Sequence, residues 1–215
     1  VFVPMLLCVA FMTIIERKAM GSMQRRIGPN VVGYYGVLQP FADALKLVVK
    51  EQIIPAQSNK ALFFLAPMIS LVFSLLGWAT IPFGSGMAIT DISLGMLFSL
   101  AVSSIGVYGA LFAGWAANSK YAFLGSLRST AQMVSYELIF STCVAAVILL
   151  AGSLNFTTIV EAQTSIWFIV PLFPLFIMYL ISALAELNRT PFDLPEAESE
   201  LVSGFMTEHS GMIFV

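Results

Sequence analysis

Charged side chains are scarce in this sequence: 10% of its 215 residues are Asp, Glu, Lys or Arg, whereas 59% are hydrophobic. A soluble domain carries about 25% charged residues. The composition therefore excludes an ordinary soluble domain and indicates an integral membrane protein.

Cysteine and histidine are also rare. Their scarcity excludes an iron–sulfur cluster and argues against a histidine metal site. Cys8 and Cys143 lie far apart in apolar runs, where a free cysteine behaves as a small buried hydrophobic group. An iron–sulfur cluster needs about four thiolates, so this chain cannot hold one. The single histidine, His209, has no second His or Cys nearby, which argues against a metal site.

Five apolar runs each approach the ~20 residues that a helical span requires. They cover residues 1–15, 61–83, 92–117, 131–152 and 165–187, and a sixth run begins at Gly211 and stops at Val215. The pattern predicts an all-α polytopic transmembrane helix bundle with five full spans and a truncated sixth. Since the sequence also lacks an initiator Met, we expect residues 1–215 to be a single transmembrane domain that is incomplete at both ends.

The basic residues alternate between the connections in a way that predicts orientation, because Lys and Arg favour the side from which a membrane protein is inserted. The connections after spans two and four contain no base and carry only Asp91 and Glu161. All ten bases follow spans one, three and five: Arg17, Lys18, Arg25, Arg26, Lys46, Lys50 and Lys60, then Lys120 and Arg128, then Arg189. We call their side of the membrane the charged face and the other side the neutral face, and we expect function or a partner at the charged face.

The first connection on the charged face contains a turn signal and a helix signal. Residues 26–30 read Arg-Ile-Gly-Pro-Asn, a composition typical of a tight turn. From Pro40 onward, apolar residues recur at helical spacing with charged residues between them. This pattern predicts a short interfacial amphipathic helix of about a dozen residues that ends before Pro55, with simple surface anchoring as the alternative role.

One carboxylate, Glu137, lies inside the fourth apolar run, nine residues past Arg128. A charged group at such a depth costs roughly 2.5–3.5 kcal/mol on insertion scales unless it is protonated, paired or hydrated. Two interpretations remain open: Glu137 hydrogen-bonds a neighbouring helix as a packing group, or it relays protons beside a water-filled cavity.

The third charged connection is the densest in acids. Its carboxylates are Glu186, Asp193, Glu196, Glu198 and Glu200, with Arg189 as the local base. Asp193 and Glu196 have the spacing of a capping box, so some of these acids could simply begin a helix. Like charges this close raise one another's pKa values and favour proton sharing, so we also expect a proton-handling role.

Two groups of segments closely resemble the NADH dehydrogenase subunit 1 family, whose members form the membrane heel of respiratory complex I. The first group comprises residues 16–18, 24–30 and 36–47, and the second comprises residues 185–194 and 196–205. The resemblance covers the whole chain, although the family's proteins are longer, with eight spans.

The resemblance implies a subunit of a proton-translocating NADH:ubiquinone oxidoreductase with no redox centre of its own. Ubiquinone would be the substrate, and flavin and iron–sulfur clusters would lie in partner subunits. By position, Glu16, Arg17, Arg26 and Phe214 match residues of the quinone tunnel. Asp43, Glu137, Glu186, Asp193, Glu196, Glu198 and Glu200 match the acidic proton path. His209 stands where the family usually has Tyr, which implies a more pH-sensitive site.

The implied partners are the hydrophilic quinone-site subunits, the antiporter-like membrane subunits and membrane lipid, with no role for nucleic acid. The implied location is the mitochondrial inner membrane with the charged loops facing the matrix, or alternatively a bacterial plasma membrane. Two rival functions remain open. One is the homologous membrane subunit of an energy-converting hydrogenase, and the other is a stand-alone ion transporter, which would be expected to contain inverted repeats.

Overall fold

The structure is a computed structural model that describes residues 2–84, 87–189, 191–194 and 204–210. Every regular element within these ranges is a helix, which confirms the all-α prediction. The chain forms two compact units, one of residues 1–53 with 210–215 and one of residues 54–209. The single domain expected from the sequence stays a prediction.

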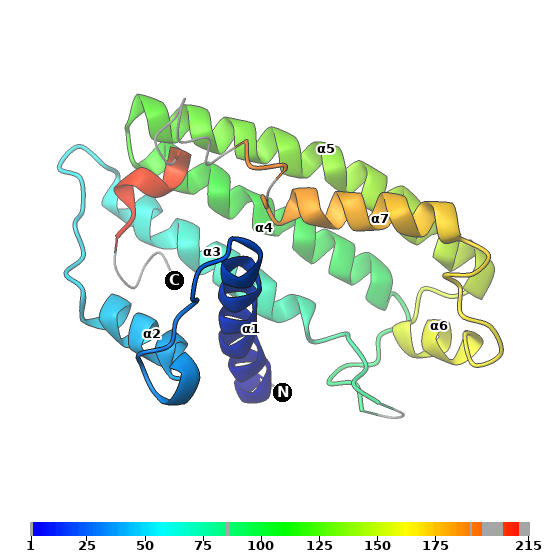
Figure 1. Cartoon of the computed structure of the whole chain (residues 1–215). Helices are drawn as coiled ribbons and strands as arrows, with labels where there is room; N and C mark the ends of the chain where they lie inside the picture. Colours follow the sequence, from blue (N-terminus) through cyan, green and yellow to red (C-terminus); the bar gives the residue numbers. More distant parts are fainter. Residues whose placement is uncertain (1, 85–86, 190, 195–203, 211–215) are drawn as a thin grey trace. The chain divides into compact units, whose positions relative to one another are not determined.

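The first unit contains α1 (Phe2–Met23), the 3₁₀ turn η1 (Tyr34–Gly36) and α2 (Gln39–Val49) (Figure 1). Helix α1 runs beyond the predicted span of residues 1–15 and includes the charged residues 16–18. The amphipathic helix predicted from Pro40 is confirmed as α2, with Pro at its first turn, where a missing N–H costs nothing. The ring of Phe41 on α2 meets that of Phe11 on α1 edge to face, with 6.0 Å between centroids.

The loop between α1 and α2 folds back on the end of α1, as the turn signal suggested. A Cβ on Gly28 would lie 3.1 Å from the Cα of Lys18, a tighter contact than most Cβ atoms make, so glycine eases the close approach of the two backbones. Gly36 has φ +75°, and a Cβ there would lie 2.2 Å from the carbonyl oxygen of Pro29. These two glycines fix the returning path of the loop.

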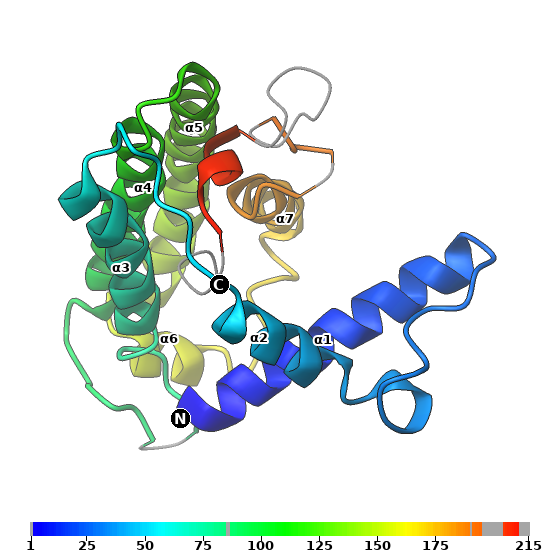
Figure 2. The ribbon, with the colours of Figure 1, turned by 90° about the vertical axis from the view of Figure 1, so that its left-hand side faces the viewer.

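The second unit contains α3 (Lys60–Gly77), α4 (Gly95–Ala116), α5 (Lys120–Ala151), α6 (Phe156–Ala162), α7 (Phe173–Glu186) and the 3₁₀ turn η2 (Gly204–Glu208). Helix α4 packs between α3 and α5, and α5 packs against α7 (Figures 1 and 2). Small residues line these contacts, and Ala66, Ala122 and Ser126 are completely buried. Close approach through small residues is the usual way in which membrane helices associate.

Within the described residues, three helices, α3, α4 and α5, are long and apolar enough to cross a membrane. Helix α7 has 14 residues and begins at Phe173 rather than at 165, with Pro174 in its first turn, a position that Pro favours. The count of five full spans therefore stays a prediction.

The helix that contains the fourth predicted span begins earlier in the chain than the span itself. Helix α5 begins at Lys120 rather than at 131, so Arg128 is helical and the connection to α4 is only a turn. Asn118 makes this turn in the left-handed region, with φ 53°, a conformation that Asn tolerates better than most residues. The residues after this turn form a helix despite their polarity, because residues such as Ala122 pack fully buried in the unit.

Candidate functional site

Two acidic side chains of the second unit meet neighbouring residues of α4. Ser103 Oγ donates a hydrogen bond of 3.0 Å to Glu186 Oε1 on α7. Ser104 Oγ hydrogen-bonds Glu137 Oε1 on α5. Both carboxylates are half-buried. The structure thus gathers Glu137 and Glu186, which lie 49 positions apart in sequence, at one level of α4.

Helix geometry explains how a single position along α4 serves two other helices. Consecutive residues of an α-helix point about 100° apart, since 3.6 residues complete a turn. Ser103 therefore faces α7 while Ser104 faces α5. These contacts agree with the interpretation of Glu137 as a hydrogen-bonding partner of a neighbouring helix, and they leave its proton-relay role a prediction. Neither serine was expected from the sequence.

A buried amide, Gln132 on α5, holds the segment that follows α7. Its Nε2 lies 2.8 Å from the carbonyl oxygens of both Ala185 and Phe192, and the Phe192 ring packs against Tyr136 with centroids 5.4 Å apart. Glu186 and the first residues of the acidic connection are therefore fixed against α5. The next residue, Asp193, has a buried Oδ1 without a hydrogen-bond partner within the described ranges.

The remaining acids of the predicted proton path, Glu196, Glu198 and Glu200, lie outside the described residues, as does Phe214 of the predicted quinone site. The capping box of Asp193 and Glu196 is likewise only half described.

In the first unit, two predicted site residues form an ion pair. Arg17 Nη1 on α1 lies 2.7 Å from Asp43 Oδ2 on α2, and Gln39 Nε2 donates to Asp43 Oδ1 at 3.1 Å. The hydrogen bond from Arg17 holds the pKa of Asp43 below its usual range, against the opposing effect of burial and with a further contribution from Gln39. The family resemblance placed Arg17 in the quinone tunnel and Asp43 in the proton path, and the structure joins them.

The other two predicted quinone-site residues of this unit lie nearby in the chain. Glu16 is half-buried on α1, and Arg26 is exposed in the returning loop. Arg26 Nε donates to Gln24 Oε1 at 2.7 Å. Lys18 supports the same loop, since its Nζ donates to the carbonyl oxygen of Tyr35.

His209 occupies a sheltered position in the second unit. Its ring stacks on that of Phe63, with centroids 4.1 Å apart and planes 11° from parallel. Burial lowers the pKa of His209, although the Ala113 carbonyl and the charge of Glu208 act in the opposite direction. Within the described ranges, no group of three His, Cys, Asp or Glu side chains could hold a metal ion.

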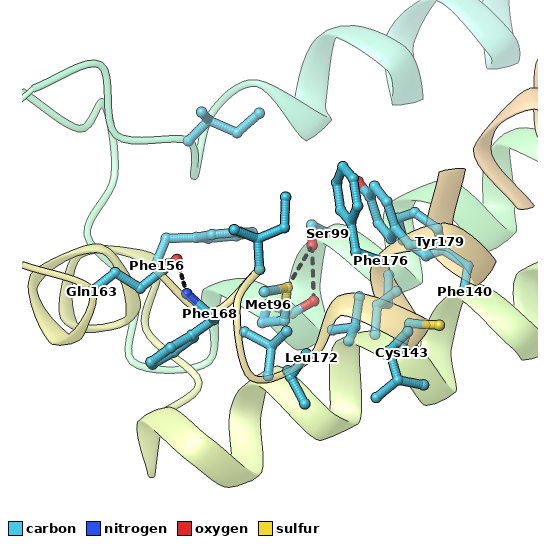
Figure 3. Close-up of a pocket in the computed structure, with 16 residues that line it drawn as sticks. Met96, Ser99, Phe140, Cys143, Phe156, Gln163, Phe168, Leu172, Phe176 and Tyr179 are labelled. Carbon is cyan, nitrogen blue, oxygen red and sulfur yellow. Dashed lines mark hydrogen bonds between the residues drawn. The ribbon is translucent and has the colours of Figure 1, made fainter. Parts of the chain in front are cut away.

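An apolar cavity of about 610 Å³ lies at the neutral-face ends of α4, α5 and α7, beside α6 (Figure 3). Two of its polar side chains are hydrogen-bonded locally: Ser99 donates to the Met96 carbonyl at 2.8 Å, and Gln163 accepts from the Phe168 N–H at 3.3 Å. None of the predicted site residues lines it. Glu137 and Glu186 thus lie outside the cavity lining.

Comparison with known proteins gives consistent matches. The profile of a family described as NADH dehydrogenase matches residues 1–215. The chain is 75% identical to NADH-ubiquinone oxidoreductase chain 1 of Mycosarcoma maydis, over 100% of this chain and 65% of that protein. It is 63% identical to the protein of the same name from Podospora anserina, over 100% of this chain and 59% of that protein.

A bacterial relative is nearly as similar. A subunit of the NADH-quinone oxidoreductase of Rhodospirillum centenum is 58% identical over 99% of this chain and 63% of its own length. The chain thus spans about three-fifths of the length of the curated relatives it matches.

Proposed function

Because the chain belongs to the NADH dehydrogenase family, we propose that it is part of the membrane subunit of a proton-pumping NADH:ubiquinone oxidoreductase. In this proposal the subunit forms part of the ubiquinone tunnel and the beginning of an acidic proton path. The relatives are named as ubiquinone or quinone oxidoreductase chains, and the three long apolar helices fit a membrane location. We place the iron–sulfur clusters in partner subunits, since the two cysteines of this chain cannot ligate one, and we assign the flavin to partner subunits as the family resemblance implies.

The proposed location is the mitochondrial inner membrane, with the charged face toward the matrix. The fungal relatives favour this location over a bacterial plasma membrane. Hydrophilic quinone-site subunits would bind at the charged face, and antiporter-like membrane subunits would receive protons from the acidic path.

The observation that carries the proton-path proposal is the meeting of Glu137 and Glu186 on one level of α4. Carboxylates within membrane helices are costly and are retained mainly where they serve transport or pairing. Here two of them, from different helices, are each hydrogen-bonded to a serine hydroxyl of the apolar helix α4. Gln132 fixes the acidic connection next to Glu186, so protons could pass from that connection into the pair.

For the quinone tunnel, the support lies in the first unit. Arg17 and Asp43 clamp α1 to α2, and the glycine-shaped loop holds exposed Arg26 near the end of α1. A cationic side chain there would polarise the carbonyl oxygens of a quinone headgroup at the charged face. Glu16 and Phe214 complete the proposed lining.

Replacing Glu137 or Glu186 by Gln tests the proton path. We expect each variant, in the complete complex, to assemble normally but to lower ubiquinone reduction and proton pumping at least tenfold, because Gln keeps the hydrogen-bonding shape and cannot carry a proton. Glu161→Gln is the matched control, since Glu161 is an exposed acid on α6, at the neutral face. NADH oxidation with a hydrophilic artificial acceptor reports on the partner subunits alone.

Reconstituted proteoliposomes would give both rates from one preparation. Normal ubiquinone reduction and normal pumping in both Gln variants would refute the proposed proton path. Equal losses with ubiquinone and with the artificial acceptor would indicate failed assembly instead, and blue-native electrophoresis of the complex would identify that case.

A further inference from the structure

Ser104 has more hydrogen-bond acceptors within reach than it has protons to donate. Its Oγ lies 3.0 Å from the Leu100 carbonyl oxygen, one turn earlier on α4, and it also hydrogen-bonds Glu137. A serine hydroxyl has one proton and two acceptor lone pairs. It therefore cannot donate to both oxygens at once.

The two contacts fit the two protonation states of Glu137. When Glu137 is ionised, the Ser104 hydroxyl donates to its carboxylate oxygen. When Glu137 gains a proton from the path, its new O–H donates to Ser104 Oγ, and the Ser104 proton rotates to the Leu100 carbonyl. Ser104 and Glu137 stay hydrogen-bonded throughout this exchange, and in both states the Ser104 proton has an acceptor.

Ser103 differs from its neighbour in this respect. Within the described part of the chain its side-chain hydrogen bond is the one to Glu186, so its proton has a single acceptor there. Ser103 thus has one acceptor for its proton, the Glu186 carboxyl group, whereas Ser104 has two. The asymmetry comes from the Leu100 carbonyl.

We propose that Ser104 is a positioning residue that holds Glu137 against α4 in both protonation states by exchanging its hydroxyl proton between Glu137 and the Leu100 carbonyl. Ser103 is the corresponding positioning residue for Glu186. The proposal rests on the proton path described above. It assigns to the Ser104 hydroxyl the task of keeping Glu137 in place while a proton passes.

Three serine variants in the complete complex test this proposal. Ser104→Ala removes the hydroxyl, and we expect coupled ubiquinone reduction to fall about tenfold, the factor that corresponds to one hydrogen bond to a charged group. Ser104→Thr keeps a hydroxyl that can also bond the carbonyl one turn back, so we expect it to retain at least half of the rate. Ser99→Ala on the same helix is the matched control, because Ser99 donates only within its own turn, to Met96.

A double variant separates positioning from general damage. Since Ser104 acts through Glu137, adding Ser104→Ala to Glu137→Gln should lower the residual rate by less than twofold. Infrared difference spectra of the reduced and oxidised complex give a readout that does not depend on turnover. Ser104→Ala should shift a protonated-carboxyl band that is missing in Glu137→Gln.

The outcomes distinguish the two proposals. If Glu137→Gln lowers turnover but Ser104→Ala has the wild-type rate and an unshifted carboxyl band, the role of Ser104 is refuted and the proton path stands. Equal losses in Ser104→Thr and Ser104→Ala would also refute it, because the hydroxyl would then be irrelevant. If Glu137→Gln itself turns over normally, Glu137 has no part in the proton path, and the role of Ser104 is refuted with it.

Discussion

A methyl group added at Gly114 should disrupt the packing of α4 against α5. A Cβ at this position would lie 2.3 Å from Ser126 Cβ and 2.5 Å from the Ala122 carbonyl oxygen. Ala122 and Ser126 are completely buried, and a carbonyl within a helix cannot rotate away without breaking the helical hydrogen bond. We therefore predict that Gly114→Ala forces the two helices apart.

The size of the effect follows from these distances. Cβ atoms essentially never approach other heavy atoms within 3.0 Å, so the helices must separate locally by about 0.7 Å, which forfeits a quarter or more of the dispersion energy of the neighbouring contacts. Overpacking of this kind costs about 1–3 kcal/mol. That cost corresponds to a roughly 5- to 150-fold loss in the folded population relative to the unfolded one.

Gly106→Ala is the matched control. Gly106 lies on the same helix as Gly114, and a Cβ there would have no neighbouring atom within 4 Å. Alanine in a helix interior is about 0.5–1 kcal/mol more favourable than glycine, so this variant should be neutral or slightly stabilising. Thermal unfolding of the detergent-solubilised complex, together with the amount assembled, gives the comparison. Equal stabilities of the two variants would refute the close-packing argument.

The titrating side chains give two further predictions. Asp43→Asn should speed amide hydrogen exchange in residues 39–49 by no more than about fivefold at neutral pH. The reason is that an ion pair as exposed as Arg17–Asp43 stabilises the packing of α2 on α1 by at most about 1 kcal/mol. A larger change would contradict this weak role of the ion pair. Burial against Phe63 lowers the pKa of His209, so the unfolded chain binds the proton more readily and stability should be lost as pH falls from about 6.5 toward the lower folded pKa. His209→Phe should remove this pH dependence from thermal unfolding curves, and an unchanged slope between pH 6.5 and 5 would contradict the assignment.

The hydrophobic pattern of the sequence correctly predicted those helices whose residues form one continuous apolar or amphipathic run. The prediction from Pro40 became α2, and the second and third apolar runs became α3 and α4. The pattern failed where packing outweighed polarity, since the helical residues 120–130 look like a loop but pack in the unit through small residues. It also missed α6, whose 7 residues are too few for a periodic signal.

Part of the candidate site could be found from the sequence, and part could not. Glu137 and Glu186 stand out because charge is rare in apolar runs. Ser103 and Ser104 do not, since serine is common in membrane helices and their partners lie 83 and 33 residues away. Contacts across such separations depend on which helices become neighbours, and residue spacing in one sequence carries no information about that.

The length of α5 has a consequence for the membrane around it. Its 32 residues rise about 48 Å at 1.5 Å per residue, whereas the hydrocarbon core of a bilayer is about 30 Å thick. The excess lies at the end that carries Lys120 and Arg128, so that end can stand in the headgroup layer or beyond it without burying charge. A thinner bilayer would change the tilt of α5, and with it the height of Glu137 relative to α4. Lipid chain length is therefore a variable that should affect this protein independently of any substitution.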